Sequence, residues 1–192
     1  MEVAIENIRA RFGKRSIYQA VLMGDLKMPG WGVHEVIMPE HNSNVLASRL
    51  DSEKANKLLE HFPDAQYDSF ARCFLLHPLS EPTFKGQILI ITAGTADLPV
   101  AREAWLTARY LGHEAEILLD VGVSGIHRLL DKQHLLEQAE VIIVVAGMEG
   151  ALVSVVGGLV QQPVIAVPTS VGYGAHFQGL APLLSMLNEY AQ

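Results

Sequence analysis

From Gln87 onward the sequence repeats one pattern: a short apolar run, a turn that contains glycine, and a helix-like stretch. The first run, Gln87–Thr92, is almost wholly apolar, which is typical of a strand buried on both faces. Strands that alternate with helices form parallel sheets with right-handed crossovers. The pattern therefore predicts a doubly wound α/β domain. Its other expected strands are 114–120, 141–145 and 164–167, and its expected helices are 97–111, 126–136, 150–160 and 178–190.

Residues 1–86 lack this alternation. The apolar spacing over residues 2–19 predicts an amphipathic helix, and a second helix is expected over 53–61. The stretch 24–44 is rich in Gly, Pro, His and Asn and has no steady period. We therefore expect a small N-terminal α+β appendage over residues 1–86, followed by the α/β domain over residues 87–192.

Charge limits the ligands that the α/β domain can bind. The whole chain has a net charge of −7, and from Gln87 onward there are only four basic side chains against ten acidic ones. Non-specific binding to nucleic acid depends on Lys and Arg that neutralise phosphates, so we expect no nucleic-acid partner. A phosphorylated ligand would instead be held by backbone amides, by a metal ion or by groups from a neighbouring subunit.

Cysteine content and hydropathy bear on the compartment. Cys73 is the only cysteine, so no internal disulfide can form, which favours a reducing compartment. No charged-then-apolar signal segment opens the chain, and we expect a cytoplasmic protein. Residues 141–160 are long enough for a membrane span, with Glu149 as their only charge, but four glycines interrupt them. A strand, a tight turn and a buried helix explain this segment better than a membrane span.

In a doubly wound domain, ligands bind beyond the carboxyl ends of the strands. The first expected loop there, 93–97, joins a strand to a helix N-terminus, where exposed amides and the helix dipole favour anions. Gly94 leaves the backbone accessible, and Thr95 adds a hydroxyl. Asp97 could bind a ribose or a base, or it could only cap the helix, and the spacing leaves both interpretations open.

The second loop extends from Asp120 to Arg128 and includes Ser124 between two glycines. His127 could act as an acid or base near neutral pH, and Arg128 could bind a carboxylate or phosphate in a bidentate way. The alternative is that His127 and Arg128 are ordinary surface residues of a helix.

The third loop places Glu149 at the mouth of an otherwise apolar segment. A carboxylate there is costly unless it has a partner or a role, and the position suits proton or metal chemistry. The alternative is an exposed glutamate that caps the next helix. The neighbouring candidates for ligand binding are Gly147, Met148 and Gly150.

The fourth loop follows the last expected strand and is rich in hydroxyls and glycine. It could line a nucleotide site, with Tyr173 stacked on a ring, or it could be a surface connection. The candidate residues of this loop are Thr169, Ser170, Gly172, Tyr173 and Gly174.

Taken in order, the four loops resemble one family. The segments TAGTADLPVAREA, DVGVSGIHRLL, VVAGMEGALVSVVGGL and PVIAVPTSVGYGA are similar to the C-terminal domain of the pyridinium-3,5-biscarboxylic acid mononucleotide synthases, over about residues 87–188. More distantly, they resemble the aminoimidazole ribonucleotide carboxylases and mutases. The resemblance implies a flavodoxin-like fold.

The resemblance also implies a reaction. The substrate would be nicotinic acid adenine dinucleotide, which is carboxylated on its pyridinium ring with CO2 or bicarbonate and hydrolysed at its phosphoanhydride to release AMP. Asp97, His127 and Glu149 would be the catalytic residues, and backbone amides of the glycine loops would hold the phosphates. A divalent metal, magnesium, would assist, and the protein would be a homo-oligomer, an octamer. Carboxylation of aminoimidazole ribonucleotide is the alternative reaction.

Two departures from the family pattern concern the end of the chain. The family places a cysteine shortly after a Leu-Asn pair, where this chain has Tyr190, and that thiol is thought to add to the pyridinium ring. The family is also expected to continue with one more strand and helix. A further alternative is therefore a paralogue that binds nucleotide without turning it over. Near the N-terminus, residues 31–37 faintly resemble the family, and so does the Ser48-Arg49 pair.

Overall fold

The computed structural model describes residues 45–77, 81–84, 86–172, 174 and 177–188. The chain divides into two compact units, Met1–Pro78 and Leu79–Gln192. The helix expected over 2–19 lies outside the described residues. Thr83 and Phe84 are anchored within the second unit. Their backbone amides both donate to the Gly112 carbonyl, at 2.8 and 2.9 Å.

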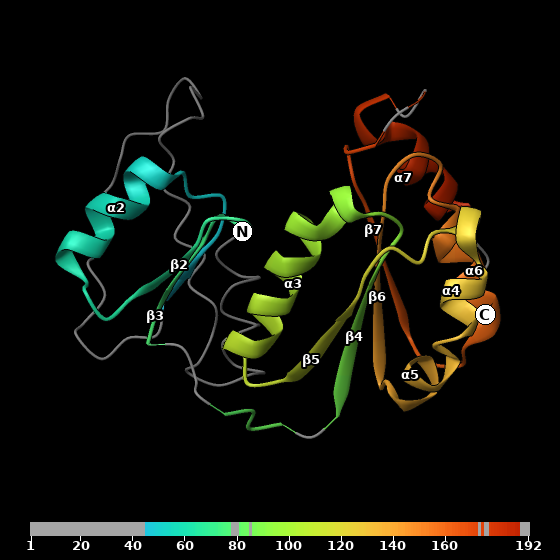
Figure 1. Cartoon of the computed structure of the whole chain (residues 1–192), viewed down its shortest axis with the longest axis horizontal. Coiled ribbons are helices and arrows are strands. Elements are labelled where there is room, and N and C mark those ends of the chain that lie inside the picture. The colour runs from blue at the N-terminus through green and yellow to red at the C-terminus, as the bar shows by residue number, and fades with distance from the viewer. Residues whose placement is uncertain (1–44, 78–80, 85, 173, 175–176, 189–192) are drawn as a thin grey trace, which may run out of the picture. The chain divides into compact units, whose positions relative to one another are not determined.

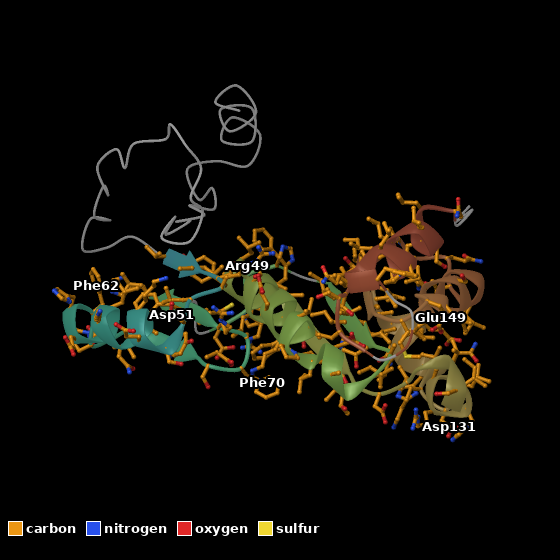
Figure 2. The ribbon with its side chains drawn as sticks, turned by 90° about the horizontal axis from the view of Figure 1, so that it is seen from above. Arg49, Asp51, Phe62, Phe70, Asp131 and Glu149 are labelled. Atoms are coloured by element: carbon orange, nitrogen blue, oxygen red, sulfur yellow. The ribbon has the colours of Figure 1, made fainter. Side chains whose placement is uncertain are left out.

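The first unit contains an antiparallel sheet and one helix. Its strands are β1 (Val45–Ala47), β2 (Gln66–Asp68) and β3 (Cys73–Leu76), in the order β1-β3-β2. Helix α2 (Ser52–His61) matches the helix expected over 53–61. It begins at Asp51, whose carboxylate accepts the Lys54 amide at 2.8 Å, and it ends at Phe62 (Figure 2). The α+β character expected of the appendage is confirmed for the residues that are described.

The second unit contains a four-stranded sheet in which every pairing is parallel. The strands are β4 (Gln87–Thr92), β5 (Glu114–Leu118), β6 (Val141–Ala146) and β7 (Val164–Pro168), in the order β5-β4-β6-β7 (Figure 1). By position in this unit the order is 2-1-3-4, which is the flavodoxin-like arrangement. The expected doubly wound fold is confirmed.

Helices cover both faces of this sheet (Figure 1). Helix α3 (Leu98–Tyr110) lies on one face, with Pro99 in its first turn, where its missing N–H has no partner to lose. The other face carries α4 (His127–Leu130), α5 (Gln133–Gln138), α6 (Ala151–Leu159) and α7 (Leu180–Leu187).

Most expected bounds agree with the structure to within one residue, and three elements differ by more. The single helix expected over 126–136 is two helices, because Lys132 adopts φ −112° and ψ 20° and interrupts the helical hydrogen bonding. The strand expected over 114–120 ends at Leu118, before Asp120 at φ 57°. The last helix begins at Leu180 rather than at 178, because Gln178 and Gly179 both have left-handed backbone conformations, which do not continue an α-helix.

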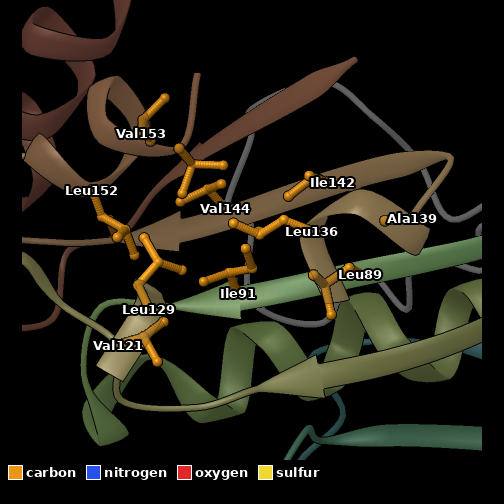
Figure 3. Packing of buried hydrophobic residues seen from close by; sticks show 12 residues of the cluster. Leu89, Ile91, Val121, Leu129, Leu136, Ala139, Ile142, Val144, Leu152 and Val153 are labelled. Carbon is orange, nitrogen blue, oxygen red and sulfur yellow. The ribbon is translucent and has the colours of Figure 1, made fainter. Parts of the chain in front are cut away.

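The main core lies between the sheet and helices α4, α5 and α6 (Figure 3). Leu129, Leu136 and Leu152, one from each helix, are at most 1% exposed. They pack against side chains of β4 and β6, and full burial of each is worth about 1.5–3 kcal/mol. This packing fixes the ends of the strands from which the loops of the candidate site emerge.

The apolar segment 141–160 consists of β6, a turn and α6, as the sequence predicts. None of the helices in the described part of the chain has both the length and the apolar composition that a membrane span requires.

Candidate active site

The four candidate loops lie together at the carboxyl edge of the parallel sheet, the upper edge in Figure 1. Backbone hydrogen bonds join neighbouring strand ends just where the loops begin. The Val121 amide donates to the Thr92 carbonyl, the Ala93 amide to the Val145 carbonyl, and the Thr169 amide to the Ala146 carbonyl, at 3.0–3.1 Å. Residues that are up to about 80 positions apart in the sequence are therefore placed on one rim, as the doubly wound fold predicts.

Asp97 is the most buried charged group of this rim, with 4% of its surface exposed. Its Oδ2 accepts the Gly94 amide at 3.1 Å, which closes the turn after β4. Its Oδ1 accepts the Thr169 hydroxyl at 2.7 Å, which ties this turn to the loop after β7. Burial raises the pKa of Asp97, and the two hydrogen bonds oppose that rise. Asp97 precedes α3 but makes no side-chain cap hydrogen bond to that helix, so the interpretation as a helix cap is wrong. It closes the preceding turn and links two loops, while Thr95 is exposed.

Two glycines allow the loops to touch. A Cβ at Gly122 would lie 2.5 Å from the Ala93 carbonyl oxygen, so the loop after β5 presses against the loop after β4. A Cβ at Gly147 would collide with the Val171 carbonyl oxygen and would lie 2.8 Å from Thr169 Oγ1. The loop after β7 therefore lies directly on the loop after β6.

The loop after β5 contains an ion pair. Asp120 has φ 57°, its amide donates to Thr92 Oγ1 at 3.1 Å, and its carboxylate lies 3.3 Å from Arg128 Nη1. The two side chains are 48% and 43% exposed, so solvent screens the pair strongly. Arg128, one of the candidate anion-binding residues, is held by Asp120 in this structure.

Ser124 and His127 are exposed on the same segment. His127 is the first residue of α4, a helix of four residues. Its imidazole therefore faces solvent and does not pack into the core. A role in proton transfer requires such an accessible imidazole.

In the loop after β6, Gly147 and Gly150 are buried, whereas Met148 and Glu149 are exposed. Glu149 lies at the turn that precedes α6 (Figure 2). The N-cap of α6 is Gly150, at φ 73°, and it has no side-chain cap. The capping interpretation of Glu149 is therefore not realised in the described part of the chain, and its carboxylate remains accessible.

The loop after β7 combines one buried and several exposed residues. Thr169 is 4% exposed, whereas Ser170, Gly172 and Gly174 are exposed. Gly172 and Gly174 have φ values of 125° and 90°, which residues with a side chain rarely adopt. Tyr173, the expected stacking residue, lies outside the described residues.

Comparisons with known proteins agree with this geometry. Residues 87–190, which include all four loops, match the AIR carboxylase family. The chain belongs to this family. Residues 33–78 match a second family, the LarB/PurE-like N-terminal domain. The AIR carboxylase match begins with β4, so it coincides with the parallel sheet and its helices.

The chain is similar to the uncharacterized protein MJ0165 of Methanocaldococcus jannaschii, which is longer than this chain. It is 51% identical over 157 residues, which cover 78% of this chain and 60% of the relative. The chain therefore aligns with about three-fifths of the length of this relative.

The family resemblance implied magnesium, and the donor set can be tested against that expectation. Among the described residues no group of three His, Cys, Asp or Glu side chains is gathered closely enough to hold a metal ion. Magnesium is commonly bound by one or two carboxylates together with substrate phosphates. The described residues do not form a metal centre of their own, and we assign no step to a metal.

Two contributions to the rim were not predicted from the sequence. Thr92, the fully buried last residue of β4, accepts the Asp120 amide, and Asp120 in turn pairs with Arg128. The only sequence signal for Thr92 was a hydroxyl at the end of an apolar strand. For Asp120 it was an aspartate at the end of an apolar run, a residue type that tolerates left-handed backbone.

Proposed function

We propose that this chain carboxylates the pyridinium ring of nicotinic acid adenine dinucleotide and hydrolyses its phosphoanhydride. The observation that carries the proposal is the presence in one chain of an AIR carboxylase domain and a LarB/PurE-like N-terminal domain. Family membership supports carboxylase-related chemistry. The second domain favours the pyridine dinucleotide over the purine precursor. The partners are then the dinucleotide and CO2 or bicarbonate.

The reaction has two balanced parts. In the first, a nucleophile adds to the pyridinium ring, a bond forms between a ring carbon and the carbon of CO2, the proton on that ring carbon leaves to a base, and the nucleophile departs. In the second, water cleaves the phosphoanhydride, and AMP departs from the mononucleotide. The first part needs an accessible base near the ring, and the second needs groups that bind phosphate oxygens and position water.

We assign these tasks to residues of the rim. His127 and Glu149 are exposed at the rim and are the groups available to accept the ring proton or to activate water. Backbone amides of Thr95 and Gly147 hold the phosphates, since this domain has few basic side chains. The Gly94 and Gly150 amides donate to Asp97 Oδ2 and to the Gly147 carbonyl, and they shape the two turns. Asp97 orients the first of these turns through its hydrogen bond with the Gly94 amide.

Arg128 is the one Lys or Arg in the sequence of the four loops. In the free protein its partner is Asp120, at 3.3 Å. A substrate carboxylate offers the same two-oxygen group in a geometry that guanidinium binds in a bidentate way. We assign Arg128 to the carboxylate of the nicotinic acid ring, for which it exchanges Asp120, and Ser124 and Ser170 to polar contacts with the same ligand.

A competition experiment tests the substrate. The chain is incubated with bicarbonate, magnesium and equal amounts of nicotinic acid adenine dinucleotide and aminoimidazole ribonucleotide, and both are followed by mass spectrometry. Consumption of the dinucleotide with release of AMP is the expected result. Carboxylation of aminoimidazole ribonucleotide alone would replace the proposal by the second candidate, which the AIR carboxylase match favours.

The alternative of a binding protein without turnover is addressed by Tyr190→Cys. A pyridinium ring is electron-poor and attacks CO2 readily only after a nucleophile has added to it, and a phenol is a weak nucleophile at neutral pH. If the unmodified chain binds the dinucleotide without product and Tyr190→Cys forms product, the chain is a member of the family that lacks only the nucleophile. Equal turnover by both chains excludes a role for position 190.

We also propose that the active form is a homo-oligomer, an octamer. Helix α7 exposes Leu183, Leu184 and Leu187, at 41%, 52% and 72%, which supports burial against another copy. Sedimentation velocity measures the mass directly. An assembly of eight chains is expected, and a monomer at micromolar concentration would contradict this part of the proposal.

A further inference from the structure

The hydrogen bond between Thr169 and Asp97 joins two loops that are far apart in the sequence. The donor follows β7 and the acceptor follows β4, 72 positions earlier, and both residues are 4% exposed. At 2.7 Å the bond has the length of a strong hydroxyl–carboxylate interaction. It is a buried connection, and water does not compete for it as it does at the surface.

The surroundings of Thr169 leave its hydroxyl little freedom. Its amide donates to the Ala146 carbonyl at 3.0 Å, which fixes its backbone on the end of β6. Its Oγ1 would lie 2.8 Å from a Cβ at Gly147, and its carbonyl oxygen 3.2 Å from a Cβ at Gly179. The hydroxyl is therefore enclosed between the loops after β6 and β7, with the Asp97 carboxylate as its acceptor.

Within the described residues, both hydrogen-bond donors to the Asp97 carboxylate are neutral. These are the Thr169 hydroxyl and the Gly94 amide. The charged groups on the neighbouring elements are Asp120 and Arg128, which pair with each other, Glu149 on the loop after β6, and Arg102 and Glu103 on α3. Among the described residues none of them contributes a charge interaction to the pKa of Asp97, which burial raises. The two neutral donors are thus the groups that stabilise the ionised carboxylate.

We propose that Thr169 is a positioning residue: its hydroxyl fixes the Asp97 carboxylate against the Gly94 amide and so joins the loops after β4 and β7 into one rigid rim. Loss of the hydroxyl leaves the carboxylate with a single donor. The turn at Gly94 is then free to rotate away from the orientation in which its backbone faces a ligand. Thr169 acts through Asp97 and does not itself need to touch the ligand.

Two substitutions separate the hydroxyl from the shape of the side chain. Thr169→Val keeps the volume and removes the donor, whereas Thr169→Ser keeps the donor and removes a methyl group. Asp97 is observed directly in the full chain, without substrate, by labelling aspartate carboxyl carbons with carbon-13 and following their NMR shifts with pH. Asp97→Asn identifies the signal of Asp97 by its disappearance.

The expected result is a titration midpoint of Asp97 that moves to higher pH in Thr169→Val and stays near the wild-type value in Thr169→Ser. The Gly94 amide is expected to exchange faster with solvent in Thr169→Val only. An unchanged midpoint in Thr169→Val would overturn the inference, and so would equal changes in both variants, since a role in packing alone would produce them.

A kinetic measurement extends the test and rests on the proposed function. In Thr169→Val the acid limb of the kcat/KM profile is expected to shift to higher pH. The value at neutral pH is expected to fall about tenfold, the loss of one hydrogen bond to a charged group, and Thr169→Ser is expected to restore it. The NMR result does not depend on the substrate. Expected NMR changes without any carboxylation would therefore refute the proposed function and leave the role of Thr169 intact.

Discussion

The carboxyl edge of the sheet has two regions that differ in burial. In the buried region, hydrogen bonds hold Asp97 and Thr169 and tie the half-buried Gly94 to them, and close contacts leave no room for a Cβ at Gly147. In the exposed region, His127 and Glu149 face solvent. The difference indicates a division of tasks: the buried region sets the shape of the rim before any ligand arrives, and the exposed region supplies groups that can exchange protons.

The largest expected effects concern activity and fall on the exposed region. His127→Asn and Glu149→Gln remove a titrating group without altering packed contacts. Turnover is expected to fall about 10²–10⁴-fold in each, the range for loss of a general acid or base. Urea unfolding should shift by less than about 0.5 kcal/mol, because both side chains are exposed. Near-normal turnover in either variant would remove that residue from the chemistry.

Substitutions in the buried region are expected to lower the free energy of unfolding. Gly147→Ala places a methyl group against the Val171 carbonyl and Thr169 Oγ1, and overpacking at such a contact costs about 1–3 kcal/mol. Urea unfolding measures the loss.

The matched control for this substitution is Gly157→Ala in α6, where a Cβ would meet nothing within 4 Å. It is expected to raise stability by about 0.5–1 kcal/mol, because alanine is the better helix former. Equal effects of the two substitutions would contradict the close contact at Gly147.

Asp97 should also make stability depend on pH. Burial raises its pKa in the folded protein, so the folded state binds this proton more tightly than the unfolded state. The resulting contribution is complete below the ordinary carboxyl pKa of about 4 and is lost as the pH rises through the folded-state pKa.

The Asp97→Asn variant has no titratable group at position 97, so it serves as the reference for the pH dependence of stability. The free energy of unfolding of the wild type minus that of Asp97→Asn is therefore expected to decrease as the pH rises from about 4. Urea titrations at a series of pH values measure the difference. An increase over the same window would mean that the hydrogen bonds from Thr169 and Gly94 outweigh burial.

The smallest effect is expected for the half-exposed ion pair. Asp120→Asn keeps a residue type that tolerates φ 57° and removes the charge that faces Arg128. The free energy of unfolding is expected to fall by less than about 1 kcal/mol, and by less still at high salt. A large loss that persists at high salt would place Asp120 among the structural residues of the rim.

The sequence predicts the positions of β4, β6 and β7 because each is an almost continuous apolar run next to a glycine or proline, and that signal is local. The run of β5 is interrupted by Glu114 and Glu116, and its position follows from the alternation of strands and helices. It also places the candidate residues on the right loops, since the carboxyl ends of parallel strands share one edge. The break at Lys132 and the start of the last helix at Leu180 were not predicted, because backbone angles at single polar or glycine residues decide them.

The hydrogen bond between Asp97 and Thr169 could also not be predicted from the sequence. Its partners are 72 positions apart, and each has a plausible role by itself, a helix cap for one and a ligand contact for the other. Only the arrangement of β4, β6 and β7 brings them together. The sequence also does not show whether Glu149 caps helix α6. In the structure the N-cap of α6 is Gly150, in a left-handed conformation, and not Glu149.

The most direct test of the account is the fate of labelled bicarbonate. The chain is incubated with nicotinic acid adenine dinucleotide, magnesium and carbon-13 bicarbonate, and the products are read by mass spectrometry, with Glu149→Gln as the control. The account predicts a dicarboxylated mononucleotide that carries the label, AMP in equal amount, and neither product from the control. Unlabelled dinucleotide recovered intact from the wild-type chain would contradict it.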